Sequence, residues 1–387
     1  MNINLNNANK KTKEFVLDVI NDIGYYQSAW NDTRQTIHLD KQILTDEYLT
    51  AIPDYAYYPI DIRKTLESEN LLLYNCMFII GKRQINVRVI SPECRTIKQT
   101  IVKYIFMWLH VIIKYSPELC SQSLDIYLSL TSNLKTLPTV GGDSINLSHA
   151  NTAFTFSCKE KNHIHIYRKE EWFKVFIHES FHAFGIDFSE TDAGYSDKYA
   201  FEIFPVSTDF KLYEAYCETW ATIIHILFIY QQNDNLQLND PRVVFNDINK
   251  LLEKEVMFSL FQCCKILVHF KISYDDMCNI NTNGHMSKIN NFKETTPIIS
   301  YFFFKTILLF NACKFADWCS LNNMNNMLIF SDDNHEYRKK RDFAGMIKDL
   351  YREVNFLRYI TYVQTKYNEA DVDAFSANTL RMTLLDV

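Results

Sequence analysis

Residues 163–185 read HIHIYRKEEWFKVFIHESFHAFG, a run of alternating residues followed by a run with helical spacing. Apolar and polar residues alternate over His163–Arg168, which is typical of a β-strand. From Glu170 to Phe184 the apolar residues recur at helical spacing, two acids stand in the first turn, and Gly185 follows the last turn. These start and stop signals predict a helix over 170–184 that comes directly after a strand.

Three residues of this predicted helix form the pattern H-E-x-x-H, namely His178, Glu179 and His182. Side chains four residues apart on a helix lie on one face, so both imidazoles can reach a single metal ion. Glu179 projects beside them and can take a proton from a water molecule held by that metal. Two neutral imidazoles and an open coordination position favour one zinc ion, although copper or nickel binds the same nitrogens.

A zinc ion needs a third protein ligand, and a second predicted helix, Tyr213–Tyr230, offers Glu214 and Glu218 four residues apart. One carboxylate can bind the metal, and the other can accept the free N–H of a ligand histidine. Asp187 and Asp192 follow the motif closely and are alternative ligands; Asp187 can also support a ligand without binding the metal.

HESFH followed about thirty residues later by EAYCE resembles the gluzincin branch of the zincin metallopeptidases, which carries HExxH on one helix and ExxxD or ExxxE on the next. The resemblance implies a zinc-dependent peptidase with Glu214 as third ligand, Glu218 as the outer acid and Glu179 as general base and acid. It also implies that a peptide or protein substrate pairs with an edge strand at 152–158. The residues of that strand chosen as substrate contacts are Thr152, Ala153, Phe154, Thr155 and Phe156.

Zincins often use a tyrosine or histidine to stabilise the oxyanion. The tyrosines nearest the motif in sequence are Tyr195, Tyr199, Tyr213 and Tyr216. Tyr213 is chosen as a catalytic candidate because it is adjacent to Glu214.

HESFHAFG also begins like the metzincin pattern HExxHxxG, which requires His or Asp three residues after the glycine. Phe188 occupies that position and Asp187 lies one residue early, so the chain departs from the metzincin pattern. NTAFTF at 151–156 together with residues 163–189 also resembles uncharacterised zincin-like proteins of large DNA viruses. That likeness implies a viral protein located in the host cytoplasm or the virion.

The same ligands also fit a zinc-stabilised structural or protein-interaction protein that has lost turnover. Such a protein needs neither Glu179 nor an open metal position, and a fourth ligand such as Asp187 or His225 would favour it. Ser180 is interpreted as an ordinary helix residue, because no base geometry supports a nucleophile there. His163 and His165 alternate on one strand face and are interpreted as polar strand residues rather than a second metal site.

The patterns around the motif predict an α+β chain, in which a zincin-like mixed sheet with its active-site helix is followed by a mainly helical lobe. The predicted domains are an N-terminal extension over 1–50, the sheet lobe over 51–190 and the helical lobe, carrying the third ligand, over 191–387. Strands are predicted at 71–80, 84–90, 124–130, 152–158 and 163–168, and further helices at 14–23, 96–115, 241–270, 297–311, 337–354 and 372–384. Residues 54–62 are expected to be irregular.

The amino-acid composition excludes several classes of function. The 387 residues are 47% hydrophobic with a net charge of −6, which indicates a globular protein and no nucleic-acid partner. Eight glycines provide no phosphate-binding loop, and no apolar run is long enough for a membrane span. Ten cysteines without a C-x-x-C pair, and no apolar leader, favour buried thiols in a reducing, intracellular compartment.

Overall fold

The computed structural model describes residues 1–386 except 2, 93–94, 192–194, 207, 209, 233–239, 279–288, 324–326, 331–335 and 370–373. The chain is α+β, as predicted. It divides into two compact units. We call residues 16–134 and 152–186 the sheet unit, and residues 1–15, 135–151 and 187–386 the helical unit. This division differs from the predicted boundaries at 50 and 190.

The predicted N-terminal extension is instead largely part of the sheet unit. Helix α1 (Lys10–Thr33) is longer than the predicted stretch, and its Trp30 packs on Phe106 with 5.4 Å between ring centroids. Asp22 of the same helix accepts a 2.6 Å ion-pair contact from Lys114. Because the apolar positions of α1 recur at helical spacing, they bury against neighbours rather than remaining loosely attached.

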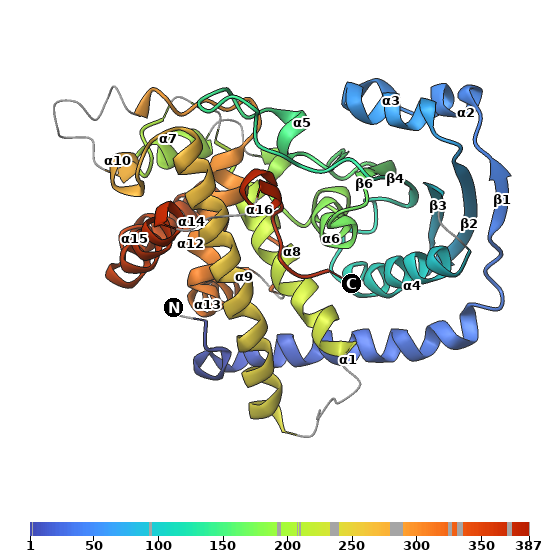
Figure 1. Cartoon of the computed structure of the whole chain (residues 1–387). Coiled ribbons are helices and arrows are strands. Elements are labelled where there is room, and N and C mark those ends of the chain that lie inside the picture. The colour runs from blue at the N-terminus through green and yellow to red at the C-terminus, as the bar shows by residue number, and fades with distance from the viewer. Residues whose placement is uncertain are drawn as a thin grey trace. The chain divides into compact units, whose positions relative to one another are not determined.

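The sheet has six strands in the order β1-β2-β3-β4-β6-β5. Figure 1 labels all of them except β5. Their bounds are β1 Asp40–Ile43, β2 Leu72–Ile80, β3 Arg83–Ser91, β4 Ser123–Thr131, β5 Ala153–Thr155 and β6 Lys161–Arg168. Strands β1 to β3 are antiparallel, β3, β4 and β6 are parallel, and β5 runs antiparallel to β6 at the edge. The predicted hairpin is confirmed, since β2 and β3 are joined through Gly81, which has φ +59°.

Helices α4 (Arg95–Ile112) and α6 (Trp172–Ala183) lie on the concave side of this sheet (Figure 1). The indole N–H of Trp108 in α4 donates to Ser180 Oγ in α6 at 2.7 Å. The other face is covered by α2 (Asp46–Ala51), a 3₁₀ turn at Tyr55–Tyr57 and α3 (Ile60–Ser68). Their buried side chains form one apolar cluster with Tyr127 and Tyr167 of the sheet, so residues 54–62 are more ordered than predicted.

The described part of the helical unit contains several helices (Figure 1). Its α-helices are α5 Leu147–Ala150, α7 Tyr195–Phe201, α8 Leu212–Gln231, α9 Pro241–His269, α10 Tyr274–Cys278, α12 Lys305–Phe310, α13 Ala312–Asn322, α14 Glu336–Leu350, α15 Val354–Glu369 and α16 Ala374–Asn378. Residues Ile299–Phe304 form a π-helical segment before α12, where one continuous α-helix was predicted. The predicted helix at 372–384 is short, because 379–386 is non-helical and 372–373 lie outside the described residues.

The predicted buried thiols are confirmed at the seven free cysteines described, Cys76, Cys217, Cys263, Cys264, Cys278, Cys313 and Cys319. The same prediction is wrong for Cys120 and Cys158, which form a disulfide. These two cysteines are 38 residues apart, and their pairing depends on how β4, β5 and β6 are brought together. Cys94 lies outside the described residues.

Among the described helices, none has by itself the length and apolar character needed to cross a membrane. Ile299–Phe310 and Ala312–Asn322 meet that requirement only together, and they are bent by 92° at their junction.

Candidate metal centre

Helix α6 carries the H-E-x-x-H motif and begins two residues later than predicted. Glu171 is the N-cap with a left-handed backbone at φ +58°, so both acids precede the helix. The predicted end is confirmed: Gly185 has φ +63°, its N–H donates to His182 O, and Ile186 N–H donates to Phe181 O. These two hydrogen bonds make a Schellman motif, which requires the left-handed glycine.

Every residue of α6 from Phe173 to Ala183 is buried, so the helix has no solvent-facing side. His178 is 5% exposed, and Glu179 and His182 are each 8% exposed. Three polar side chains within one buried helix are unfavourable unless hydrogen bonds or a metal ion satisfy them. The burial therefore favours a specific role for the motif over a solvated helix face.

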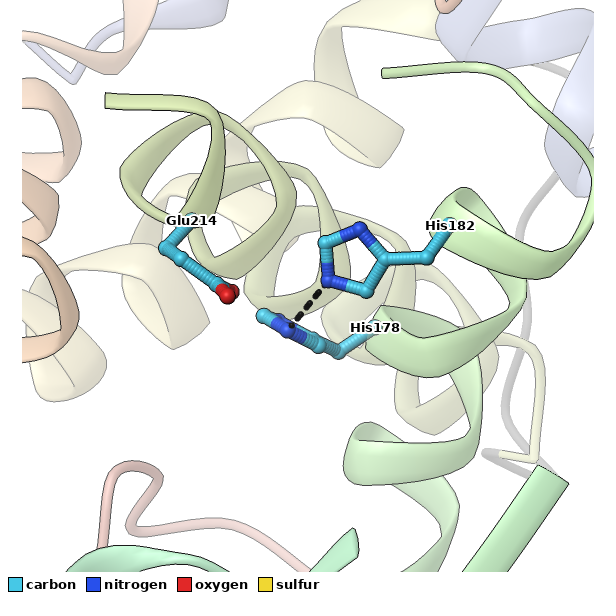
Figure 2. Close-up of side chains that lie close together, drawn as sticks. All are labelled: His178, His182 and Glu214. Carbon is cyan, nitrogen blue, oxygen red and sulfur yellow. Dashed lines mark hydrogen bonds between the residues drawn. The ribbon is translucent and has the colours of Figure 1, made fainter. Parts of the chain in front are cut away.

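The two imidazoles point toward each other, with their Nε2 atoms 3.1 Å apart (Figure 2). Two ligand atoms in a tetrahedral zinc site, each about 2.05 Å from the ion, lie about 3.3 Å apart. The separation of the two nitrogens therefore matches a pair of zinc ligands. The placement follows from the four-residue spacing on one helical face.

Glu214 is grouped with these two histidines. One ligand atom from each of His178, His182 and Glu214 lies within 4.8 Å of the other two (Figure 2). Glu214 is half-buried in the first turn of α8, where a carboxylate interacts favourably with the helix dipole. Two imidazoles and one carboxylate are a donor set that suits zinc with one position left open.

A second group of potential ligands shares one of these histidines. His182, Asp187 and Cys217 also have ligand atoms within 4.8 Å of one another. Asp187 accepts a 3.1 Å hydrogen bond from the hydroxyl of Ser189, and Cys217 is buried on α8. Asp187, which the sequence offered as an alternative ligand or a supporting residue, belongs to this second group, whereas Asp192 lies outside the described residues.

The other predicted residues of α8 are not in either ligand group. Glu218 is 3% exposed and Tyr213 is half-buried with its ring edge-on to Phe188. His225 is buried on the same helix and belongs to neither group. Phe188 packs on Phe330 with 4.0 Å between ring centroids, so the position where metzincins have a ligand is part of an aromatic core.

Of the alternative tyrosines, Tyr216 is fully buried, and its hydroxyl donates to Leu328 O at 2.6 Å and accepts from Asn323. Those contacts make Tyr216 a core residue. Tyr199 is half-buried on α7, and the side chain of Tyr195 lies outside the described residues.

The predicted edge strand is shorter than expected. Only Ala153–Thr155 form β5, with Phe154 opposite His165, while Thr152 and Phe156 flank the strand. Thr152 O still accepts from Tyr167 N–H, but Phe156 O accepts from the side chain of Asn162. The chain therefore turns away from the sheet after Thr155, which the alternation of residues did not reveal.

Sequence reasoning missed the residues that hold the C-terminal end of α6. Cys158 N–H donates to His182 O at 3.1 Å, Ser121 Oγ to Ala183 O at 2.7 Å and Ser116 Oγ to Phe184 O at 3.1 Å. The two serine hydroxyls satisfy carbonyls near the helix end that lack an intrahelical partner, and Cys158 N–H gives His182 O a second donor beside Gly185 N–H. Gly185, just past the helix, was the single local signal for this arrangement.

Comparisons of the chain with protein-family models, with curated proteins and with solved structures return no match.

Proposed function

We propose that this protein is a zinc-dependent peptide hydrolase whose metal ligands are His178, His182 and Glu214. The observation that carries the proposal is the convergence of these three ligand atoms, two of them from one buried helix (Figure 2). The resemblance of HESFH and EAYCE to the gluzincin pattern supports the same assignment.

When bound, zinc lowers the pKa of water and polarises a carbonyl group. Glu179, adjacent to the first ligand histidine, takes a proton from the attacking water and delivers it to the departing amine. Glu218 holds a ligand histidine in its correct tautomer and orientation. Tyr213, next to Glu214, is the proposed donor to the oxyanion.

The position of β5 at the sheet edge supports peptide recognition. In the described sheet, β5 pairs with β6 on one side only, and an extended substrate can add to its other side as a further strand. Its three residues provide a short stretch of main-chain pairing.

The first test separates metal binding from catalysis. Glu179→Gln keeps the size of the side chain and removes the base, so we expect one zinc per chain and a loss of hydrolysis of about 10²- to 10⁴-fold. Zinc is measured by elemental analysis, and hydrolysis with a quenched-fluorescence peptide library. Glu160→Gln, an exposed glutamate of the same unit, is the matched control. Full activity in Glu179→Gln, or zinc-free wild type after zinc supplementation, contradicts the proposal.

The second test identifies the third ligand. Glu214→Gln and Glu218→Gln are matched changes one helical turn apart on α8. Loss of a supporting acid lowers metal affinity by about 10- to 100-fold, and loss of a ligand should lower it further. The metal affinity measured by chelator competition should therefore be well below that of Glu218→Gln in the Glu214→Gln variant. The reverse order would make Glu218 the ligand.

The second group of ligand atoms supports a second candidate, a zinc-stabilised protein without turnover. Asp187 and Cys217 are both grouped with His182 and could complete a closed site. Cobalt substitution distinguishes the two candidates, because a thiolate ligand adds a sulfur-to-metal charge-transfer band. A band abolished by Cys217→Ser, together with unaltered metal content in Glu179→Gln and no hydrolysis by wild type, favours the non-catalytic candidate.

A further inference from the structure

Four side chains of the sheet unit, His163, His165, Tyr58 and Ser129, form one continuous hydrogen-bond chain on the face opposite α6, and Asp54 makes an ion-pair contact with its outer end. Asp54 Oδ2 lies 3.3 Å from His163 Nε2, and His163 Nδ1 lies 2.7 Å from His165 Nε2. His165 Nδ1 lies 3.1 Å from the Tyr58 hydroxyl, which lies 3.4 Å from Ser129 Oγ. Asp54 is partly exposed and Ser129 is fully buried, so the chain leads from solvent into the core.

Three of the four ring nitrogens of the two histidines take part in these hydrogen bonds, and the fourth, His163 Nε2, faces Asp54. The direction of the hydrogen bonds therefore depends on the number of protons that the two rings carry. Asp54 lies beside His163 Nε2 and favours a proton on that nitrogen, because a carboxylate cannot donate to an unprotonated nitrogen. With both rings neutral, His163 Nδ1 accepts from His165 Nε2–H, and His165 Nδ1 accepts from the Tyr58 hydroxyl. If His163 gains a proton, its Nδ1–H donates to His165 Nε2. His165 then carries its proton on Nδ1 and donates to Tyr58, whose hydroxyl turns to Ser129.

The added proton belongs on His163 rather than His165. His165 is stacked between Tyr127 at 4.7 Å and Phe154 at 4.5 Å, and burial lowers its pKa to about 2. The pKa of His163 is also lowered, chiefly by burial and further by Lys159, but the carboxylates of Asp54 and Asp125 raise it. Asp125 is itself paired with Arg88 at 2.6 Å. The switch therefore operates on the acid side of the ordinary histidine pKa.

Side chains of this hydrogen-bond network also pack against the edge strand β5. Phe154 stands opposite His165 in the register, and its ring is nearly parallel to the imidazole. Tyr57 and Tyr58 contact the same phenylalanine ring edge-on at 5.8 and 5.9 Å. Beyond the strand, Phe156 contacts His163 edge-on at 5.1 Å, and Lys159 Nζ lies 3.5 Å from the centre of the Phe156 ring. A positive charge on His163 is therefore repelled by Lys159 next to the end of β5.

We propose that His163, His165, Tyr58 and Ser129 form a proton-switched hydrogen-bond chain beside the carboxylate of Asp54, and that His165 is a positioning residue for β5. One proton taken up by His163 reverses the direction of every bond from His163 to Ser129 and loosens β5 from β6. The link between β5 and substrate binding rests on the proposed function; the switch itself does not.

The direct test is a pH titration of the full chain with ¹⁵N-labelled histidine, followed by long-range ¹H–¹⁵N NMR. His163→Gln and His165→Gln assign the two rings. We expect His165 to stay neutral while its proton moves from Nε2 to Nδ1, with the same midpoint as the charging of His163. The proposal is overturned if the tautomer of His165 does not change while His163 titrates. Once the two rings are assigned, this measurement needs only wild-type protein.

Matched tyrosine variants test the direction of the chain. Tyr58→Phe removes the acceptor that the protonated state needs, so we expect about a tenfold loss of proton affinity at His163. Tyr55→Phe removes the hydroxyl of a neighbouring ring that contacts Tyr58 at 5.1 Å and lies outside the chain, and it should leave the midpoint unchanged. Equal midpoints in the two variants contradict the reversal.

Hydrogen exchange tests the positioning role. After correction for intrinsic rates, amides of residues 153–158 should exchange faster below the His163 midpoint, whereas those of the β2–β3 hairpin should not. His163→Gln should abolish this pH step. An unchanged step in that variant, or no step in wild type, overturns the role of His165 in positioning β5. These measurements require neither zinc nor turnover, so they stand or fall separately from the Glu179→Gln test.

Discussion

Gly185 ends the motif helix and lies against the disulfide between Cys120 and Cys158. Its left-handed backbone ends α6, and a Cβ built there would lie 2.9 Å from Cys120 Sγ and 3.0 Å from Cys158 Cβ. The residue is thus required twice, once for its backbone conformation and once for the absence of a side chain.

We expect Gly185→Ala to lower the free energy of unfolding of the sheet unit by about 2–4 kcal/mol, from backbone strain together with the contact on the disulfide. Gly81→Ala is the matched control, because Gly81 has a similar φ of +59° and no atom within 4 Å of the added Cβ. Its cost should be confined to about 1 kcal/mol of backbone strain. Urea unfolding measures both, and equal losses would show that the contact contributes nothing.

The two histidine pairs show that the same residue type serves different purposes. His178 and His182 are four residues apart on a helix, and His163 and His165 are two residues apart on a strand; both spacings place the rings on one face. The first pair is grouped with a carboxylate as potential metal ligands. In the second pair, His163 makes an ion-pair contact with Asp54, and His165 is hydrogen-bonded to Tyr58. The expectation that His163 and His165 are polar strand residues omitted this network.

At the scale of elements, His165 of β6 lies opposite Phe154 of β5, and its burial there should make the stability of the protein depend on pH. His165 has a folded-state pKa of about 2 because it is buried, and an unfolded histidine has a pKa of about 6.5. A depressed folded-state pKa means that the unfolded chain binds more protons below pH 6.5, so stability present above that pH is lost as the pH falls.

We expect His165 alone to lower the free energy of unfolding by about 2 kcal/mol between pH 6.5 and about 4.5. His165→Phe keeps a ring between Tyr127 and Phe154 and should reduce the acid-side slope, as measured by urea unfolding at several pH values. His38→Gln, at an exposed position of the same unit, is the control and should keep the wild-type slope. A slope unaffected by His165→Phe would show that His165 is not the residue responsible.

At the scale of the whole molecule, the C-terminal segment joins distant parts of the helical unit. Leu380 N–H donates to Lys135 O, and Leu137 N–H donates to Asn378 O. The carboxylate of Glu255 on α9 accepts from Thr383 Oγ1 at 2.6 Å and from the backbone N–H groups of Leu384 and Leu385. The last residues described are thus structural even though they form no helix.

We expect Glu255→Ala to lower the free energy of unfolding of the helical unit by about 2–4 kcal/mol, because a fully buried carboxylate and its three hydrogen bonds are lost. Glu255→Gln keeps an acceptor and should lose less. Glu253→Ala, at an exposed position on the same helix, should be neutral within about 0.5 kcal/mol. Indistinguishable stabilities for Glu255→Ala and Glu253→Ala would show that the segment is not held by Glu255.

Much of the local structure followed from the residues alone. The apolar spacing predicted α8, α9 and most of the strands, and Gly185 predicted the end of α6. The start of α6 was misplaced because Glu170 and Glu171 resemble a first turn, whereas Glu171 adopts a left-handed backbone before the helix. Short elements such as β1 and α2 were missed, because four to six residues carry too little periodicity.

The sequence by itself determined that two imidazoles and a carboxylate share one helix and that two acids one turn apart stand on another, because helical spacing is set by the backbone within each segment. Only the tertiary structure decided that Cys120 meets Cys158 and that Asp54 reaches His163. Each of these contacts joins residues about thirty or more positions apart. Such contacts depend on how strands and helices pack, which no local pattern records.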